Sequence, residues 1–140
     1  MNSNIGIDRR QKRSAIMRAV KGRDTKPELA VRKLLRPIAS GYRLHRKDIP
    51  GCPDIAFVGR RLAVFVHGCF WHGHRCRRGA RIPKSNRRYW VQKISRNHVR
   101  DKKIRKALRK RGWRVLVIWE CQLKKPQALS ASLRAFVKTT

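Results

Sequence analysis

Ten residues near the middle of the chain, from His67 to Cys76, hold three of its five histidines and two of its four cysteines. Proteins bind zinc through four nitrogen or sulfur ligands in a tetrahedron, and closely spaced Cys and His supply such ligands within one short loop. A metal bound in this loop restricts the fold, because every segment that supplies a ligand must lie next to it. We therefore expect a fold that is stabilised by a metal ion bound at this segment.

Spacing alone leaves the choice of zinc ligands open. A closed structural site can be formed by four side chains, namely Cys69, His74, Cys76 and Cys121. Through Cys121, that set would tie the loop to the end of the last predicted strand. The same spacing also permits His72 in place of His74, and Cys52 is another candidate for the fourth ligand. The alternative, that all of these are ordinary buried side chains, is weaker because the segment is so rich in ligand types.

The charge balance indicates the class of partner. The 140 residues include 38 Lys and Arg against 7 Asp and Glu, a formal net charge of +31, which is typical of proteins that bind polyanions. The longest apolar runs, Leu62–Val66 and Val115–Trp119, are five residues each and too short to cross a bilayer. Met1–Asp8 shows no secretory signal, so the expected compartment is the reducing cytoplasm, at the nucleoid, where cysteines favour metal ligation over disulfides.

Local patterns predict a single α/β domain over 25–140, preceded by a basic arm over 1–24. Thr25 and Glu28 form a capping box at the start of a helix. Helical spacing recurs from Tyr89 up to Gly112. The other predicted elements are strands at 42–46, 55–58, 62–66 and 113–119 and a closing helix at 126–137. This order predicts a small mixed β-sheet flanked by helices.

The few carboxylates are informative in so basic a chain. Asp54 follows Pro53 at the start of an apolar strand, where an unpaired buried carboxylate is costly. A Mg²⁺ ion held between Asp54 and a phosphate would remove that cost, and an Arg partner is the alternative. Glu28 has a structural role in the capping box, which does not exclude a catalytic one. Histidines that zinc leaves free, His67 and His72, suit proton transfer near a metal-bound phosphate, with phosphate binding or solvent exposure as the alternatives.

Aromatic side chains stand among these positive charges. Phe70 and Trp71 lie inside the polar loop, and Tyr89 and Trp90 open a helix that is rich in Arg and Lys. Rings amid positive charge suit stacking on bases or insertion between base steps. Packing around the loop or in the core is an equally good explanation for any one of these rings.

Three runs of the sequence carry a resemblance to a known family. They are Pro50–Asp54, Phe65–Cys76 and Gly112–Cys121, and the similarity extends to Ser14–Val20, Arg23–Thr25, Tyr89–Trp90, Asn97 and Asp101. In this order and spacing, the chain resembles the very-short-patch-repair (Vsr) mismatch endonucleases. Members of that family have a restriction-endonuclease-like fold and use Mg²⁺ to nick one DNA strand on the 5′ side of the thymine in a T:G mismatch. The resemblance implies that fold and that activity here.

The resemblance also implies roles for individual residues of the catalytic centre. Asp54 and the backbone carbonyl of Val66 would hold Mg²⁺. His72 would be the general base that activates water, and Asp101 would orient it. The remaining polar groups of the centre are matched by two further residues, His67 and Glu28.

The resemblance also resolves what spacing leaves open for the DNA contacts and for the Cys- and His-rich loop His67–Pro83, called the metal loop below. It implies a structural zinc on Cys69, His74, Cys76 and Cys121, with Cys52 outside the site and without an assigned role. The aromatics that insert beside the mispair from the major groove would be Phe70, Trp71 and Trp90. Met17, in the arm, would contact the minor groove. The implied partner is double-stranded DNA with a mismatch, bound by a monomer, with other mismatch-repair proteins as candidate partners.

Two other readings of the sequence compete with this function. The first is a nuclease of the same fold whose target is a different mismatch or a modified base, since motifs cannot separate the targets and the surplus of Lys and Arg favours less specific DNA contacts. The second is a noncatalytic, zinc-stabilised nucleic-acid-binding module. Composition alone favours that module, but it does not explain Asp54, His72 and Asp101.

Overall fold

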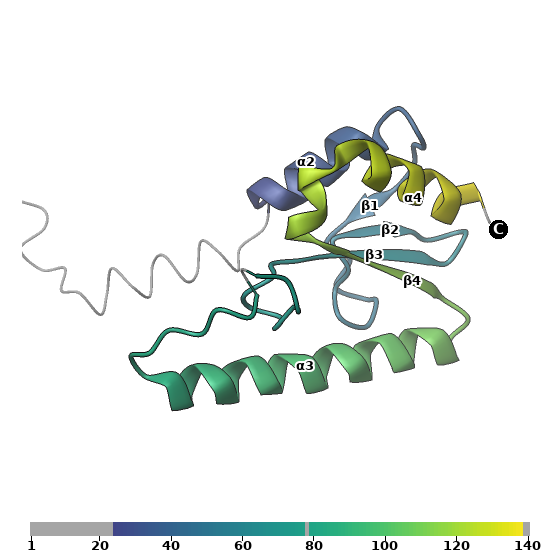
Figure 1. Ribbon diagram of the computed structural model, residues 1–140. Coiled ribbons are helices and arrows are strands. Elements are labelled where there is room, and N and C mark those ends of the chain that lie inside the picture. The colour runs from purple at the N-terminus through teal and green to yellow at the C-terminus, as the bar shows by residue number, and fades with distance from the viewer. Residues whose placement is uncertain (1–23, 78, 139–140) are drawn as a thin grey trace, which may run out of the picture.

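The computed structural model describes residues 24–77 and 79–138, and Figure 1 shows their arrangement. The helices are α2 (Lys26–Leu35), α3 (Arg87–Lys110), the short η1 (Glu120–Lys124) and α4 (Pro126–Lys138). The strands are β1 (Arg43–Leu44), β2 (Ile55–Phe57), β3 (Leu62–His67) and β4 (Arg114–Trp119). The order of elements predicted from residue 25 onward is confirmed. Nearly all of the predicted arm, including Met17, lies outside the described residues.

The four strands form the small mixed sheet that the sequence predicts, in the order β1-β2-β3-β4. The first three pair antiparallel, and β3 pairs parallel with β4. Their parallel register places His67 opposite Trp119. Because parallel strands need a crossover, α3 connects them, and the ends of β3 and β4 meet at one edge of the sheet. That edge is where the metal loop begins and where Cys121 follows β4.

Helices cover both faces of the sheet (Figure 1). The core on the side of α2 and α4 is aliphatic and includes Val31, Leu35, Ile55, Leu62, Val64, Ile118, Leu129 and Leu133. A smaller core on the side of α3 joins Ala63, Phe65 and Leu108. Neighbouring residues of β3 contribute to opposite cores because strand side chains alternate between faces. The burial of both faces explains why β3 is an unbroken apolar run.

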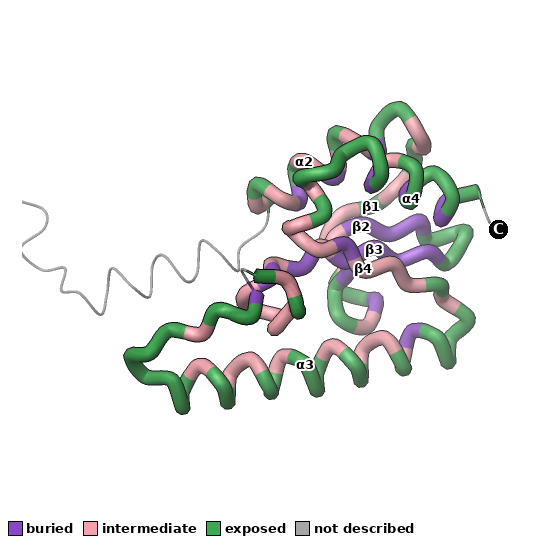
Figure 2. The backbone as a smooth tube through the Cα atoms, viewed as in Figure 1, coloured by how far each residue is buried: buried purple, intermediate pink, exposed green. Residues whose placement is uncertain are grey.

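Helix α3 extends well beyond the sheet. Leu108, near its C-terminal end, is buried, whereas the rest of the helix is half-buried or exposed (Figure 2). Its N-terminal half packs on the metal loop: Asn97 Nδ2 donates to the carbonyl of Trp71 at 2.7 Å, and His98 Nε2 lies 3.2 Å from the carbonyl of Gly73. Helix α3 therefore supports the metal loop through these hydrogen bonds and holds it at the sheet edge.

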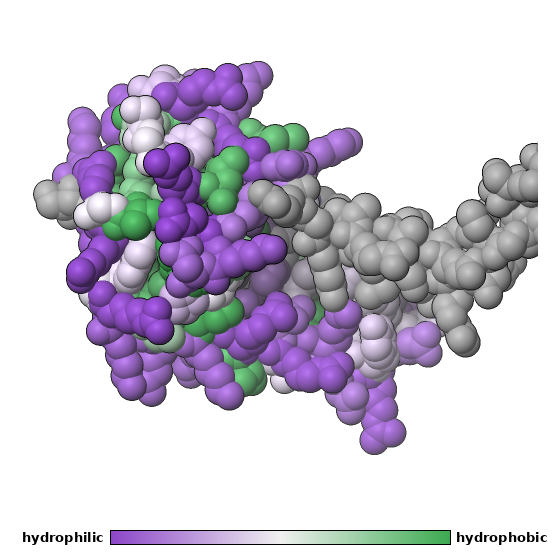
Figure 3. All heavy atoms as spheres, turned by 180° about the vertical axis from the view of Figure 1, so that it is seen from behind, coloured by the Kyte–Doolittle hydropathy of each residue, from purple (hydrophilic) through white to green (hydrophobic). Residues whose placement is uncertain are grey.

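The surface of the domain is mostly hydrophilic, as the high content of Lys and Arg leads one to expect. Figure 3 shows one face on which hydrophilic side chains dominate, with small apolar areas between them. Within residues 24–77 and 79–138, no helix combines the length and the apolar character that a membrane crossing requires.

Candidate active site and metal cluster

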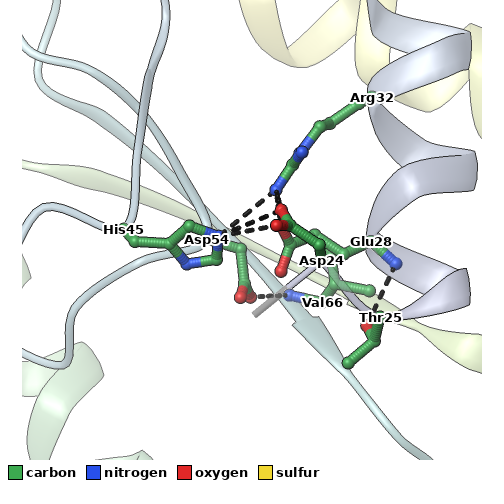
Figure 4. A network of polar contacts seen from close by, with 7 residues as sticks. All are labelled: Asp24, Thr25, Glu28, Arg32, His45, Asp54 and Val66. Carbon is green, nitrogen blue, oxygen red and sulfur yellow. Dashed lines mark hydrogen bonds and ion pairs between the residues drawn. The ribbon is translucent and has the colours of Figure 1, made fainter. Parts of the chain in front are cut away.

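Asp54 lies directly before β2, at the sheet edge. Its Oδ2 atom accepts a hydrogen bond of 2.7 Å from the backbone N–H of Val66 (Figure 4). Burial raises the pKa of Asp54, against the lowering effect of that hydrogen bond and of the positive charges of His45, His72 and Arg32. The site thus holds a partly buried carboxylate whose negative charge is incompletely compensated, which is the chemistry that a divalent cation fits.

Two of the predicted histidines stack on each other beside this edge. The rings of His67 and His72 lie 3.7 Å apart between centroids and are parallel within 2°. His67 is 7% exposed, and its Nδ1 atom has no hydrogen-bond partner within the described residues. Burial, followed by the charge of His72, lowers the pKa of His67 to about 3. His67 is therefore a neutral ring at neutral pH.

His72 is held by a carboxylate from α3. Its Nδ1 atom lies 2.6 Å from Oδ2 of Asp101, and both side chains are largely buried. Burial tends to raise the pKa of Asp101, but the hydrogen bond from His72 and the charges of His72 and Arg100 lower it overall. The carboxylate is thus ionised and accepts the Nδ1 proton, which leaves Nε2 of His72 as the ring nitrogen that Asp101 does not engage.

Glu28 lies in a polar network with two further residues, Arg32 and His45 (Figure 4). The Glu28 N–H donates to Thr25 Oγ1 at 3.4 Å, so the predicted helix cap is present. Its carboxylate is 2% exposed, pairs with Arg32 and lies 2.9 Å from Nε2 of His45. Arg32 also pairs with Asp24. Only the Thr25 half of the predicted capping box is therefore present, because the Glu28 carboxylate binds Arg32 and His45 and lies near Asp54 instead (Figure 4).

The positions of Arg32 and His45 in this network differ in how well they can be predicted from the sequence. Arg32 lies four residues after Glu28 on a predicted helix, a spacing at which opposite charges meet. That rule could have found it. His45 comes from the far end of β1, and its backbone φ of 50° is unusual for a side chain of this size. No local pattern indicates that it reaches Glu28.

The structure brings together the side chains of Cys69, His74, Cys76 and Cys121. Their candidate ligand atoms all lie within 4.8 Å of one another. Cys121 Sγ is 3.6 Å from His74 Nδ1, and the Cys121 N–H donates to Cys69 Sγ at 3.3 Å. His72 belongs to a second cluster, with His67 and Asp101, and Cys52 is exposed and belongs to none of the described clusters. Three thiols and one imidazole at this spacing fit a closed tetrahedral zinc site.

Trp119 joins the two clusters. It stacks on His74, with ring centroids 4.2 Å apart and planes inclined by 20°, and it meets His67 edge-on at 5.3 Å. The sequence predicts Trp119 only as a core residue of the last strand. Because the ring touches a metal-cluster histidine on one side and the histidine stack on the other, a shift of the metal loop would move the candidate base.

The three described aromatics that were predicted to contact DNA form one cluster. The Phe70 ring lies 5.2 Å from Trp71 and 5.4 Å from Trp90, and the two indoles are 5.7 Å apart. Lys93 Nζ is 5.9 Å from the Trp71 ring. All three rings are half-buried, so each keeps a solvent-facing portion. A cation against partly exposed rings can contact phosphate and base together.

Comparisons with known proteins agree on one family. A family model described as "DNA mismatch endonuclease Vsr" matches residues 7–78. The type II nicking enzyme V.XorIIP of Xanthomonas oryzae pv. oryzae is 52% identical over 124 residues, which cover 89% of this chain and 90% of the relative. The type II nicking enzyme V.NmeAIP of Neisseria meningitidis is 42% identical, over 91% of this chain and 90% of the relative. The DNA mismatch endonuclease Vsr of Escherichia coli is 37% identical, over 84% of this chain and 75% of the relative.

Proposed function

Because the chain belongs to the Vsr family of DNA mismatch endonucleases, we propose that it nicks one strand of duplex DNA 5′ of the thymine in a T:G mismatch, with Mg²⁺ as cofactor. The observation that carries this proposal is the His72–Asp101 pair, joined at 2.6 Å, at the sheet edge that also bears Asp54. A noncatalytic binding module has no need for such a pair. The mixed sheet with an acidic residue before β2 also supports a restriction-endonuclease-like fold.

We assign His72 as the general base. With its Nδ1 proton held by Asp101, its Nε2 atom can take a proton from the water that attacks the phosphorus. The ionised Asp101 then stabilises the imidazolium that forms. His67, kept neutral by burial, supports the ring of His72 by stacking and carries no proton in this step.

Asp54 and Val66 would hold Mg²⁺. In a β-strand the N–H and C=O of one residue point to the same side, so the Val66 carbonyl faces the side on which its N–H meets Asp54. Carboxylate and carbonyl oxygens are ligands that Mg²⁺ prefers. When bound there, Mg²⁺ would supply positive charge against the negative charge that develops on the phosphate and leaving oxygens. Arg32, with His45, balances Glu28 nearby.

The four-residue metal cluster would hold a structural zinc. The described set offers four protein ligands and so leaves no open position for substrate, as is typical of structural rather than catalytic sites. Its role would be to fix the loop that carries His72 against the edge of the sheet.

Mismatch selection would come from the cluster of Phe70, Trp71 and Trp90. A T:G wobble pair is unstacked more easily than a matched pair, so an aromatic wedge distinguishes the two by the cost of deformation. Lys93 beside Trp71 would hold a neighbouring phosphate. Met17, in the arm, would contact the minor groove on the other side.

The test is a strand-specific nicking assay with Mg²⁺, in which duplexes with a T:G pair, other mismatches or a modified base are compared with a fully paired duplex. We expect a single nick 5′ of the mispaired thymine. Preferential cleavage of another duplex would show that the target is a different mismatch or a modified base, as in the alternative nuclease of the same fold. Tight binding without cleavage of any duplex would favour the binding module.

Asp101→Asn should lower the single-turnover rate of nicking by about 10- to 100-fold, because an amide is neutral and no longer stabilises the His72 imidazolium. The Kd for the duplex should stay within about twofold, since the Asp101 side chain is 12% exposed and is paired with His72. Rapid-quench kinetics and fluorescence anisotropy measure the two quantities. Equal losses in rate and affinity would contradict the assigned role.

A further inference from the structure

Helix α3 carries a row of basic side chains on the face that points away from the sheet. At 3.6 residues per turn, five exposed basic positions fall on this face, with the exposed Gln92 and Val99 between them; the five are Arg88, Arg96, Lys103, Lys106 and Lys110. We call them the α3 row. From first to last they span about 33 Å at a rise of 1.5 Å per residue. No other described element lies on that side of α3 (Figure 1).

The α3 row faces away from the catalytic centre. The opposite face of the helix is occupied by Trp90, Asn97, Asp101 and Leu108, which contact the metal loop or the sheet. At about 100° per residue, Lys103, Lys106 and Lys110 lie roughly 140–200° around the helix from Asp101. A phosphate at His72 therefore lies on the other side of a helix about 10 Å thick from the row.

The α3 row also lacks counter-charge. The basic partners in the described ion pairs are Arg32, His45, Arg46 and His72, and none of these four lies on α3. The single acidic residue of α3 is Asp101, on the inner face. Five unpaired positive charges are thus aligned over about the length of one turn of B-DNA, which is about 34–36 Å. A convex helix with such a row is complementary to the phosphates that flank a groove.

We propose that the α3 row is a second DNA-binding surface, which binds the backbone of a second duplex segment while the first segment occupies the catalytic centre. The inference rests on the proposed function for the place of the first segment, but not on the mismatch or on cleavage. Its consequence is direct transfer: the enzyme can pass from one duplex to another without release into solvent. An enzyme whose target is rare among matched DNA gains search speed in this way.

Transfer can be measured without any nicking. The full-length protein is bound to a labelled, fully paired duplex of two helical turns, and the dissociation rate is followed as the same unlabelled duplex is added in increasing concentration. Direct transfer makes the dissociation rate rise in proportion to the competitor concentration. A protein with one DNA surface dissociates at a rate that the competitor does not change. We expect the rising rate for the parent protein.

Two matched variants test whether the rise in dissociation rate depends on the α3 row. R96Q/K103Q/K106Q/K110Q removes one Arg and three Lys from the α3 row and should abolish the rise. K124Q/K125Q/R134Q/K138Q removes the same residue types from exposed positions on η1, α4 and the residue between them, and should keep it. The salt dependence of the transfer rate should also weaken in the first variant, by a log–log slope of about 3.6 for four lost phosphate contacts.

The proposal is overturned if the parent rate does not depend on competitor, or if both variants lose the dependence equally, which would indicate a diffuse charge effect. Should the fourfold variant fail to fold, judged by circular dichroism, K103Q/K110Q is expected to halve the dependence. A chain that nicks no duplex but shows the transfer would fail the proposed function and keep this inference.

Discussion

Asp54→Asn should reduce the single-turnover rate of nicking by about a thousandfold or more while leaving DNA binding intact. The amide keeps the shape of the side chain and an oxygen that can accept the 2.7 Å hydrogen bond from Val66. It loses the negative charge that would hold Mg²⁺, and the positive charge of a metal is worth several kcal/mol at a phosphoryl transition state. Rapid-quench assays over a Mg²⁺ titration measure the loss.

Asp48→Asn is the matched control for this change, because it raises the net charge by the same amount. Asp48 is exposed, lies six residues before Asp54 and pairs with Arg46 outside the candidate site. Its variant should nick at the parent rate. If both variants lose nicking alike, or if Asp54→Asn nicks normally at ordinary Mg²⁺ concentrations, Asp54 is not the metal ligand.

The sequence predicts the elements of this fold well because their signals are local. The cap formed by Thr25 and Glu28 starts α2 where expected, and Gly112, with a φ of 82°, follows the end of α3. The unbroken apolar run Leu62–Val66 correctly indicates the strand β3. Each of these features depends on neighbours within a few residues.

Contacts within the site are harder to predict because they depend on strand register. Trp119 meets His67 only because β3 and β4 pair in parallel with these two residues opposite each other. His45 reaches Glu28 because β1 lies at the edge of the sheet next to the N-terminal end of α2. Neither contact leaves a periodic trace in the sequence. The Cys and His set was easier, since ligand chemistry narrows the candidates before any geometry is known.

Helix α3 has features of both kinds: its extent follows from a local pattern, whereas its contacts depend on the tertiary structure. Helical spacing predicts its extent, and the aromatic pair at its start suggests contact with nucleic acid. The spacing does not reveal that half of the inner face packs on a loop rather than on the sheet, where Asn97 and Asp101 hold Trp71 and His72. These contacts form only when the metal loop is folded. The candidate zinc site would hold it in that fold.

Cys121→Ala should release the metal and lower nicking by more than about a hundredfold, although the aliphatic core stays folded. Loss of one of four ligands opens the site, and even residues that only support a metal ligand cost 10- to 100-fold. The damage should reach the active site through a chain of contacts: His74 stacks on Trp119, Trp119 touches His67, and His67 stacks on His72. Metal content per chain, thermal unfolding and the nicking rate are the measurements.

Cys52→Ala separates this effect from the general loss of a cysteine. Cys52 is exposed and lies outside the cluster, so its variant should keep one metal per chain and the parent nicking rate. Treatment of the parent with a strong chelator, followed by removal of the chelator and assay in excess Mg²⁺, should reproduce the Cys121→Ala phenotype. Added zinc should then restore nicking in the treated parent but not in the variant. Because the core under α2 and α4 contains none of the ligands, its cooperative unfolding should persist in both cases. A Cys121→Ala protein that nicks normally without metal would show that the loop, and with it His72, is positioned by packing alone.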